Sequence, residues 1–161
     1  MRTFKRIFSV WNSDRGQGPL FLALMMIVAL GVGGCASNQG DTSGEALYQQ
    51  LGGEAGINKL VSLWLTNAGQ DPVLKPAFAH ADMAHLQAQM VTLIGQDAGG
   101  PQVYTGPDMY AAHQGMHITD AQWDAFMHDL HKAMQTEQIS NLTQAELLGI
   151  LLPMKTDIVG H

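Results

Sequence analysis

The chain has 161 residues, of which 46% are hydrophobic, and its formal net charge at pH 7 is −6. This length fits one compact domain with an extra segment, and it is too short for two ordinary domains. From residue 35 onward the basic residues are four lysines, set against thirteen acidic residues, which gives a net charge of −9. Because such a surface repels phosphate backbones, we expect no nucleic acid among the partners.

The first 34 residues have the layout of an export signal. Basic residues near the start precede an uncharged apolar run, Pro19–Val32, which ends in Gly33 and Gly34. A membrane-spanning helix needs about 20 apolar residues, and this run is shorter. We therefore predict a signal peptide over residues 1–34 and exclude it from the fold.

Cys35, the only cysteine, directly follows this run. A lone cysteine cannot form an internal disulfide. The segment Val32–Cys35 resembles the lipobox of bacterial lipoproteins, in which the cysteine is acylated and becomes the N-terminus after cleavage. The resemblance implies that Cys35 tethers the exported chain to a lipid membrane. Residues 36–44 are small and polar, so we interpret residues 35–45 as the lipidated cysteine and a flexible linker.

The residue after Cys35 bears on localisation. In lipoproteins an aspartate at this place is the cue for retention in the inner membrane, and here the residue is Ala36. The resemblance therefore favours anchoring in the cell envelope at an outer membrane, facing the periplasm, if the cell has one.

Residues 46–161 show helical spacing throughout and no strand-type alternation, which predicts one all-α domain. A short first helix ends at Gly52-Gly53, the second ends before Asp71-Pro72, and a third ends at Gly99-Gly100. The apolar stripe of the second helix is Ile57, Leu60, Val61, Trp64, Leu65 and Ala68. The stripe of the third is Met83, Leu86, Met90, Leu93 and Ile94.

Two longer helices close the chain after a short helical segment that carries His113. Capping boxes at Thr119–Gln122 and Thr143–Glu146 predict where these helices begin, and Pro153 predicts a kink in the second. The expected buried residues are Trp123, Phe126, Met127, Leu130 and Met134 in the first, and Leu147, Ile150, Leu151, Met154 and Ile158 in the second.

His113 is the main candidate for chemistry, because it lies on an apolar stripe with Met109 and Met116 one turn away on either side. A histidine there needs a partner. It is either a core histidine bonded to a carbonyl or a neutral imidazole that ligates a metal or haem iron. His117 completes an i, i+4 pair that could bind zinc, but no third ligand is evident. Without a Cys-x-x-Cys-His motif, any haem is bound non-covalently.

The order of several short motifs resembles that of the group I truncated globins. The matching segments are Leu47–Gly53, Asp71–Leu74, Phe78 with Asp82-Met83, Gly99–Pro101, Tyr104–Gly106, Met109–Gly115 and Leu152–Ile158. Each motif is weak, but the ordered set is specific and spans nearly all of residues 46–161.

This resemblance implies a two-over-two helical sandwich around haem b. By motif position His113 is the proximal iron ligand, Phe78 packs on the haem face and Tyr104 lies near a propionate. Met109, one turn before His113, belongs to the same site.

The distal side departs from the family pattern. Many members carry a Phe-Tyr pair where this chain has Trp64 and Leu65, so the distal hydroxyl is absent. Leu86 and Met90 stand on the next helix where the family often has a glutamine, and Gln87 and Gln89 are offset from that face. We therefore expect an apolar distal wall of the haem pocket, formed by Leu65, Leu86, Met90 and Phe126.

The function that the resemblance implies is reversible binding of O₂ or another diatomic gas at ferrous iron, in an oxygen-binding protein rather than an enzyme. Two alternatives stay open. One is an NO dioxygenase that depends on an external reductase. The other is an electron-transfer protein in which Met90 is the sixth iron ligand opposite His113.

Overall fold

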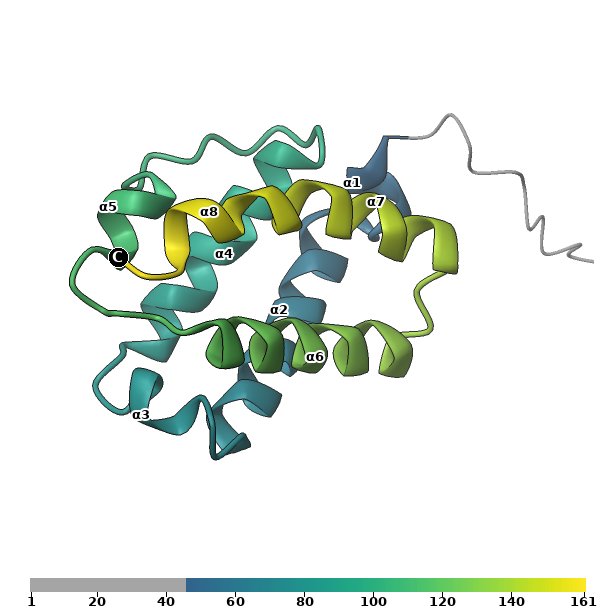
Figure 1. Cartoon of the computed structure of the whole chain (residues 1–161). Coiled ribbons are helices and arrows are strands. Elements are labelled where there is room, and N and C mark those ends of the chain that lie inside the picture. Colours follow the sequence, from purple (N-terminus) through teal and green to yellow (C-terminus); the bar gives the residue numbers. More distant parts are fainter. Residues whose placement is uncertain (1–45) are drawn as a thin grey trace, which may run out of the picture. The chain divides into compact units, whose positions relative to one another are not determined.

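The computed structural model describes residues 46–161, which form a helical domain (Figure 1). The predicted signal peptide, the tether at Cys35 and the linker lie outside the described residues. Within the described part, no helix has both the length and the apolar character needed to cross a bilayer. The regular elements are the helices α1 Leu47–Gln50, α2 Gly53–Gln70, α3 Lys75–Phe78, α4 Met83–Asp97, α5 Met109–His113, α6 Asp120–Thr136, α7 Asn141–Leu151 and α8 Lys155–Ile158, with a 3₁₀ turn, η1 Leu152–Met154, between the last two.

Helix α2 is the centre of the packing, since it lies against both α4 and α6. In Figure 1, α6 and the segment from α7 to α8 run across α2 and α4. The buried residues of α2 are the six of the predicted stripe, from Ile57 to Ala68. They form the core together with residues of α4, α6 and α7, among them Ile94, Leu130 and Leu147. The all-α prediction is confirmed, because these short helices bury their apolar faces against one another.

One of the two predicted helix starts is confirmed and the other is wrong. The Thr119 hydroxyl accepts from the backbone N–H of Gln122, whose side chain accepts from the Thr119 N–H, so α6 begins with a capping box. Helix α7, however, is capped by Ser140, one turn before the predicted position. The Thr143 hydroxyl is buried and donates instead to Oε1 of Gln50 on α1, over 2.9 Å.

A Schellman motif ends α4 and directs the chain toward the site. Gly99, at φ +84°, donates its N–H to the oxygen of Gln96, and Gly100 donates to the oxygen of Gly95. The Gln96 side chain then accepts from the backbone N–H of Tyr104 over 2.8 Å. The connection that carries Tyr104 is therefore held against α4.

The helices around His113 differ in length from the predicted ones. Helix α3, which carries Phe78, was not predicted, because a helix of four residues is too short to show an apolar stripe. Helix α5 ends at His113, so Met116 lies beyond the helix. At Pro153 the chain changes from α7 to the 3₁₀ turn, where a kink was predicted. The C-terminus returns to this region, where Gly160 N–H donates to the oxygen of Ile118.

Candidate functional site

A cavity of about 440 Å³ opens between the helices. Its lining is mainly apolar and comes from α2, α3, α4, α5, α6 and the C-terminal segment. The apolar and aromatic side chains include Trp64, Leu74, Phe78, Leu86, Met90, Leu93, Met109, Met116, Trp123, Phe126, Met127 and Met154. The polar lining residues are Asp82, His85, Gln89, Tyr104, His113 and Gln122.

Seven of the eight side chains predicted to form a haem site line this one cavity. They are Phe78, Leu86, Met90, Tyr104, Met109, His113 and Phe126. They are distant in sequence, and the fold brings them together from α3, α4, α5, α6 and the α4–α5 connection. Cys35, predicted as the lipid tether, lies outside the described residues.

The eighth, Leu65, is not part of the lining. This corrects the expectation that Leu65 helps to form the apolar distal wall of the site. Its side chain is buried in the core, with 4% of its surface exposed, and its neighbour Trp64 lines the cavity instead. Successive helical residues point about 100° apart, so the two cannot face the same space equally. The short, branched side chain of Leu65 stays within the packed core and does not reach the cavity.

His113 is held by a hydrogen bond within its own short helix. Its Nδ1 lies 2.8 Å from the backbone oxygen of Met109. A carbonyl oxygen can only accept, so Nδ1 carries the proton and donates. In the neutral form of the ring Nε2 is then the unprotonated nitrogen, which can bind a metal. An N–H bonded to a carbonyl is the support that metal-bound histidines usually have. The bond to a carbonyl and the role of ligand are thus compatible.

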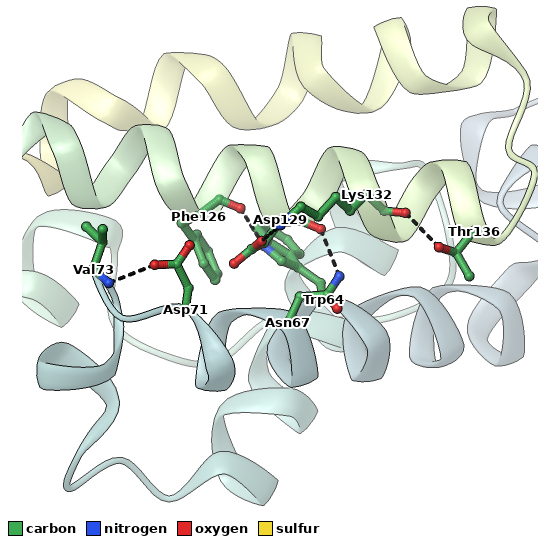
Figure 2. A network of polar contacts seen from close by, with 8 residues as sticks. All are labelled: Trp64, Asn67, Asp71, Val73, Phe126, Asp129, Lys132 and Thr136. Carbon is green, nitrogen blue, oxygen red and sulfur yellow. Dashed lines mark hydrogen bonds and ion pairs between the residues drawn. The ribbon is translucent and has the colours of Figure 1, made fainter.

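Three aromatic rings form one wall of the cavity. Trp64 and Phe126 stack with centroids 4.3 Å apart, and Phe78 meets Phe126 at 5.8 Å in a tilted arrangement. The Trp64 indole N–H donates to the backbone oxygen of Phe126 over 2.8 Å, which Figure 2 shows between α2 and α6. This indole donor is therefore already engaged.

The lining also contains polar residues that the sequence did not predict to face the cavity. Gln89, expected to be offset from the cavity, lines it, whereas Gln87 donates to Oδ1 of Asn58 over 2.9 Å. Asp82 and His85 belong to the first turn of α4, where Asp82 accepts from the His85 N–H.

Tyr104 lies at the polar part of the lining. Its hydroxyl donates to the backbone oxygen of Pro107 over 2.8 Å. Partial burial, and then the negative charge of Asp108, raise the pKa of Tyr104 above its ordinary value of 10.0. The phenol therefore stays protonated as a donor over a wide range of pH.

Comparison with known proteins places this domain in a family. The family model described as bacterial-like globin matches residues 46–159. A group 1 truncated haemoglobin of Nostoc sp. (strain MUN 8820) is 32% identical over 114 residues, which cover 71% of this chain and 97% of that protein. The chain belongs to the group 1 truncated haemoglobins. A further relative of this truncated haemoglobin, from Tetrahymena pyriformis, is 26% identical over 116 residues, covering 72% of this chain and 96% of that protein.

Solved structures confirm the expected two-over-two fold for this truncated haemoglobin. The Fe(III) form of the truncated haemoglobin from Tetrahymena pyriformis matches with a TM-score of 0.68 at 26% identity, over 71% of this chain and 98% of that one. The 2/2 haemoglobin of Synechococcus sp. PCC 7002 has the same fold, with a TM-score of 0.67 at 24% identity, over 72% of this chain and 99% of that one. The chain is thus a haem-binding globin by family.

The zinc alternative has no further support within residues 46–161. That part of the chain contains no group of three or more histidine, cysteine or acidic side chains placed to hold a metal ion. His117 does not line the cavity, and its backbone adopts a positive φ of 51° beyond the end of α5.

Proposed function

We propose that this truncated haemoglobin binds one haem b in the cavity through Nε2 of His113, and that it reversibly binds a diatomic gas, most simply O₂. The observation that carries the proposal is the bond from His113 Nδ1 to the Met109 oxygen. It holds the ring in the tautomer whose Nε2 is free for a metal. This tautomer supports the proposal, because the cofactor expected for this family needs a ligand of this kind.

The other lining residues fit a large, mostly apolar group. The cavity volume lies within the range of about 300–1,000 Å³ that is usual for ligand sites. Phe78, Phe126 and Trp64 provide flat aromatic surfaces. The polar lining at Gln89 and Tyr104 is where a carboxylate could be placed. When bound, the haem supplies an iron that can take a diatomic gas in its ferrous state.

The test is the absorption spectrum of the ferric, ferrous and CO-bound forms of the purified full-length protein. We expect His113→Ala to lose the spectrum of imidazole-ligated haem and to regain it when free imidazole is added. The matched control is His128→Ala, because His128 is exposed on α6 and does not line the cavity. An unchanged proximal-ligand spectrum in His113→Ala would show that another group holds the iron.

One observation favours electron transfer as a second candidate function. The Met90 thioether lines the same cavity as His113, and a methionine opposite a histidine is the ligand pair of several cytochromes. That alternative requires a charge-transfer band between sulfur and ferric iron that disappears in Met90→Leu. If the band is absent from the wild type, Met90 is a wall residue and the gas-binding function stands.

We also propose that the chain is exported and tethered to a membrane by acylation of Cys35. The support is the basic start, the apolar run and the Val32–Cys35 segment, all of which are sequence features. Cell fractionation with the wild type and Cys35→Ser tests it. The wild type should sediment with membranes and carry label from fatty acid, and Cys35→Ser should do neither. Equal fractionation of both would contradict the tether.

A further inference from the structure

The charge of the domain is unusual for a protein that binds haem b, because haem b carries two propionate carboxylates. Residues 46–161 contain four lysines, no arginine and eleven acidic residues. A dianionic ligand therefore approaches a domain that is itself strongly negative. The electrostatic contribution to binding then depends on where the few cations lie.

Three of the four lysines are paired with carboxylates that are not part of the cavity lining. Lys59 is bound to Glu137 at 2.6 Å, Lys132 to Asp129 at 3.0 Å and Lys155 to Asp120 at 2.8 Å. The fourth lysine is Lys75, the first residue of α3. None of the four belongs to the lining of the cavity.

The polar part of the lining offers hydrogen bonds but no permanent positive charge. The side chains of Gln89 and Tyr104 lie close together beside Gly106. A Cβ atom on Gly106 would collide with both Oε1 of Gln89 and the hydroxyl of Tyr104. Asp82 carries the one carboxylate among the described lining residues, and a carboxylate repels a propionate. His85 is the one lining side chain in this part of α4 that can become positive, and it does so only when protonated.

From this arrangement we infer that the haem is retained without ionic contacts to its propionates and that the protein readily exchanges haem with other haem-binding proteins. The inference rests on the proposed function, since it concerns the same cavity. Retention then depends on the iron bond to His113 and on apolar contacts. Charge opposes retention, so salt, which screens repulsion, should strengthen it. A site that held propionates with lysine or arginine would respond to salt in the opposite direction.

The experiment measures haem transfer. The purified full-length protein is loaded with ferric haem and mixed with an excess of apomyoglobin, and the absorbance change of the transferred haem gives the rate of loss. We expect the rate to fall as sodium chloride is raised from low to high concentration.

Two variants test the role of charge at the cavity. Gln89→Lys places a cation beside Tyr104 and should slow haem loss by roughly 3- to 30-fold at low salt, with a rate that then rises with salt. The matched control is Gln87→Lys, which adds the same charge to the same helix at a residue outside the lining. It should leave the rate within about twofold of the wild type.

Asp82→Asn is a second, independent variant that removes the carboxylate from the described cavity lining. Asparagine is as good an N-cap as aspartate, so α4 keeps its start while the repulsion is lost. Haem loss should slow in this variant as well. Equal rates in Gln89→Lys and Gln87→Lys would overturn the inference, and so would haem loss from the wild type that accelerates with salt.

These outcomes are separate from a failure of the proposed function. If His113→Ala keeps its proximal-ligand spectrum, or if no haem is taken up, the proposed site itself is wrong and the inference falls with it. If haem is bound through His113 but salt accelerates its loss, only the inference is overturned.

Discussion

Trp64 donates its indole N–H to the backbone oxygen of Phe126 over 2.8 Å, while the two rings stack at 4.3 Å (Figure 2). The contact joins α2 to α6 at the wall of the cavity. Trp64→Phe removes the donor and leaves a smaller ring, so we expect the free energy of unfolding to fall by about 1–3 kcal/mol.

Chemical denaturation measures this loss, and Trp123→Phe is the matched control. Trp123 also lines the cavity and is 7% exposed, but its indole nitrogen makes no hydrogen bond within residues 46–161. The control should lose distinctly less stability. Equal losses would mean that the indole hydrogen bond contributes nothing measurable.

The apolar side of the cavity predicts fast release of O₂. Leu86, Met90 and Phe126 offer no side-chain donor, and the Trp64 donor is engaged. A charge-assisted hydrogen bond is worth roughly 1.5–3 kcal/mol, which corresponds to one to two orders of magnitude in rate. We therefore expect Met90→Gln to slow O₂ dissociation by about 10- to 100-fold in stopped-flow measurements, with a much smaller effect on CO.

Gln89→Ala checks whether a donor is already present. Because Gln89 lines the cavity, its amide could reach the gas if the side chain turned inward. Faster O₂ release from Gln89→Ala than from the wild type would refute the fast-release prediction. Leu65→Tyr is less suitable, since Leu65 lies in the core, where a larger side chain overpacks.

Substitution of Lys132 should lower the free energy of unfolding more than substitution of its partner Asp129. Asp129 is 1% exposed, and within residues 46–161 its Oδ2 has no hydrogen-bond partner, while its Oδ1 binds Lys132 at 3.0 Å (Figure 2). Lys132→Met leaves the buried carboxylate unpaired and should cost about 2–4 kcal/mol. Asp129→Asn removes the buried charge and should change stability by less than about 1 kcal/mol in either direction. Thermal or denaturant unfolding decides, and a larger loss in Asp129→Asn would reverse the argument.

Gln138→Gly should stabilise the protein. Gln138 follows α6 with a φ of 55°, in a Schellman motif where Ile139 donates to the oxygen of Met134 over 3.0 Å. Glycine adopts this conformation without the cost of a Cβ atom, so we expect a gain of about 0.5–1 kcal/mol. Gln135→Gly, inside α6, should instead cost about 1 kcal/mol. A loss of stability in Gln138→Gly would contradict the prediction.

Tyr104 predicts a loss of stability at high pH. Its pKa is raised in the folded protein by burial and by Asp108. The folded state therefore holds the phenol proton more tightly than the unfolded chain, and stability should fall as the pH rises above about 10. Tyr104→Phe should reduce this fall, which denaturant unfolding at a series of pH values measures. Tyr110→Phe, at an exposed position, is the matched control and should leave the fall in place.

The residues alone determined the features that depend on local geometry. The 3.6-residue period placed the stripe of α2 from Ile57 to Ala68 on one face, and all six residues are buried. The Thr119 capping box marked the start of α6, because its bonds join residues only three apart. His113 stood out because it lies on an apolar stripe, one turn after Met109. The structure adds that its ring is bound to the Met109 backbone oxygen.

Tertiary structure decided which faces line the cavity and which enter the core. Trp64 and Leu65 belong to one apolar stripe, yet only Trp64 borders the cavity, and Gln89 lines it despite its offset from Leu86 and Met90. A hydrophobic period shows that a face is buried but not what lies against it. Likewise α7 is capped by Ser140 and not by Thr143, whose hydroxyl donates to Gln50, 93 residues away. Such contacts exist only once distant helices have packed together, so no local pattern encodes them.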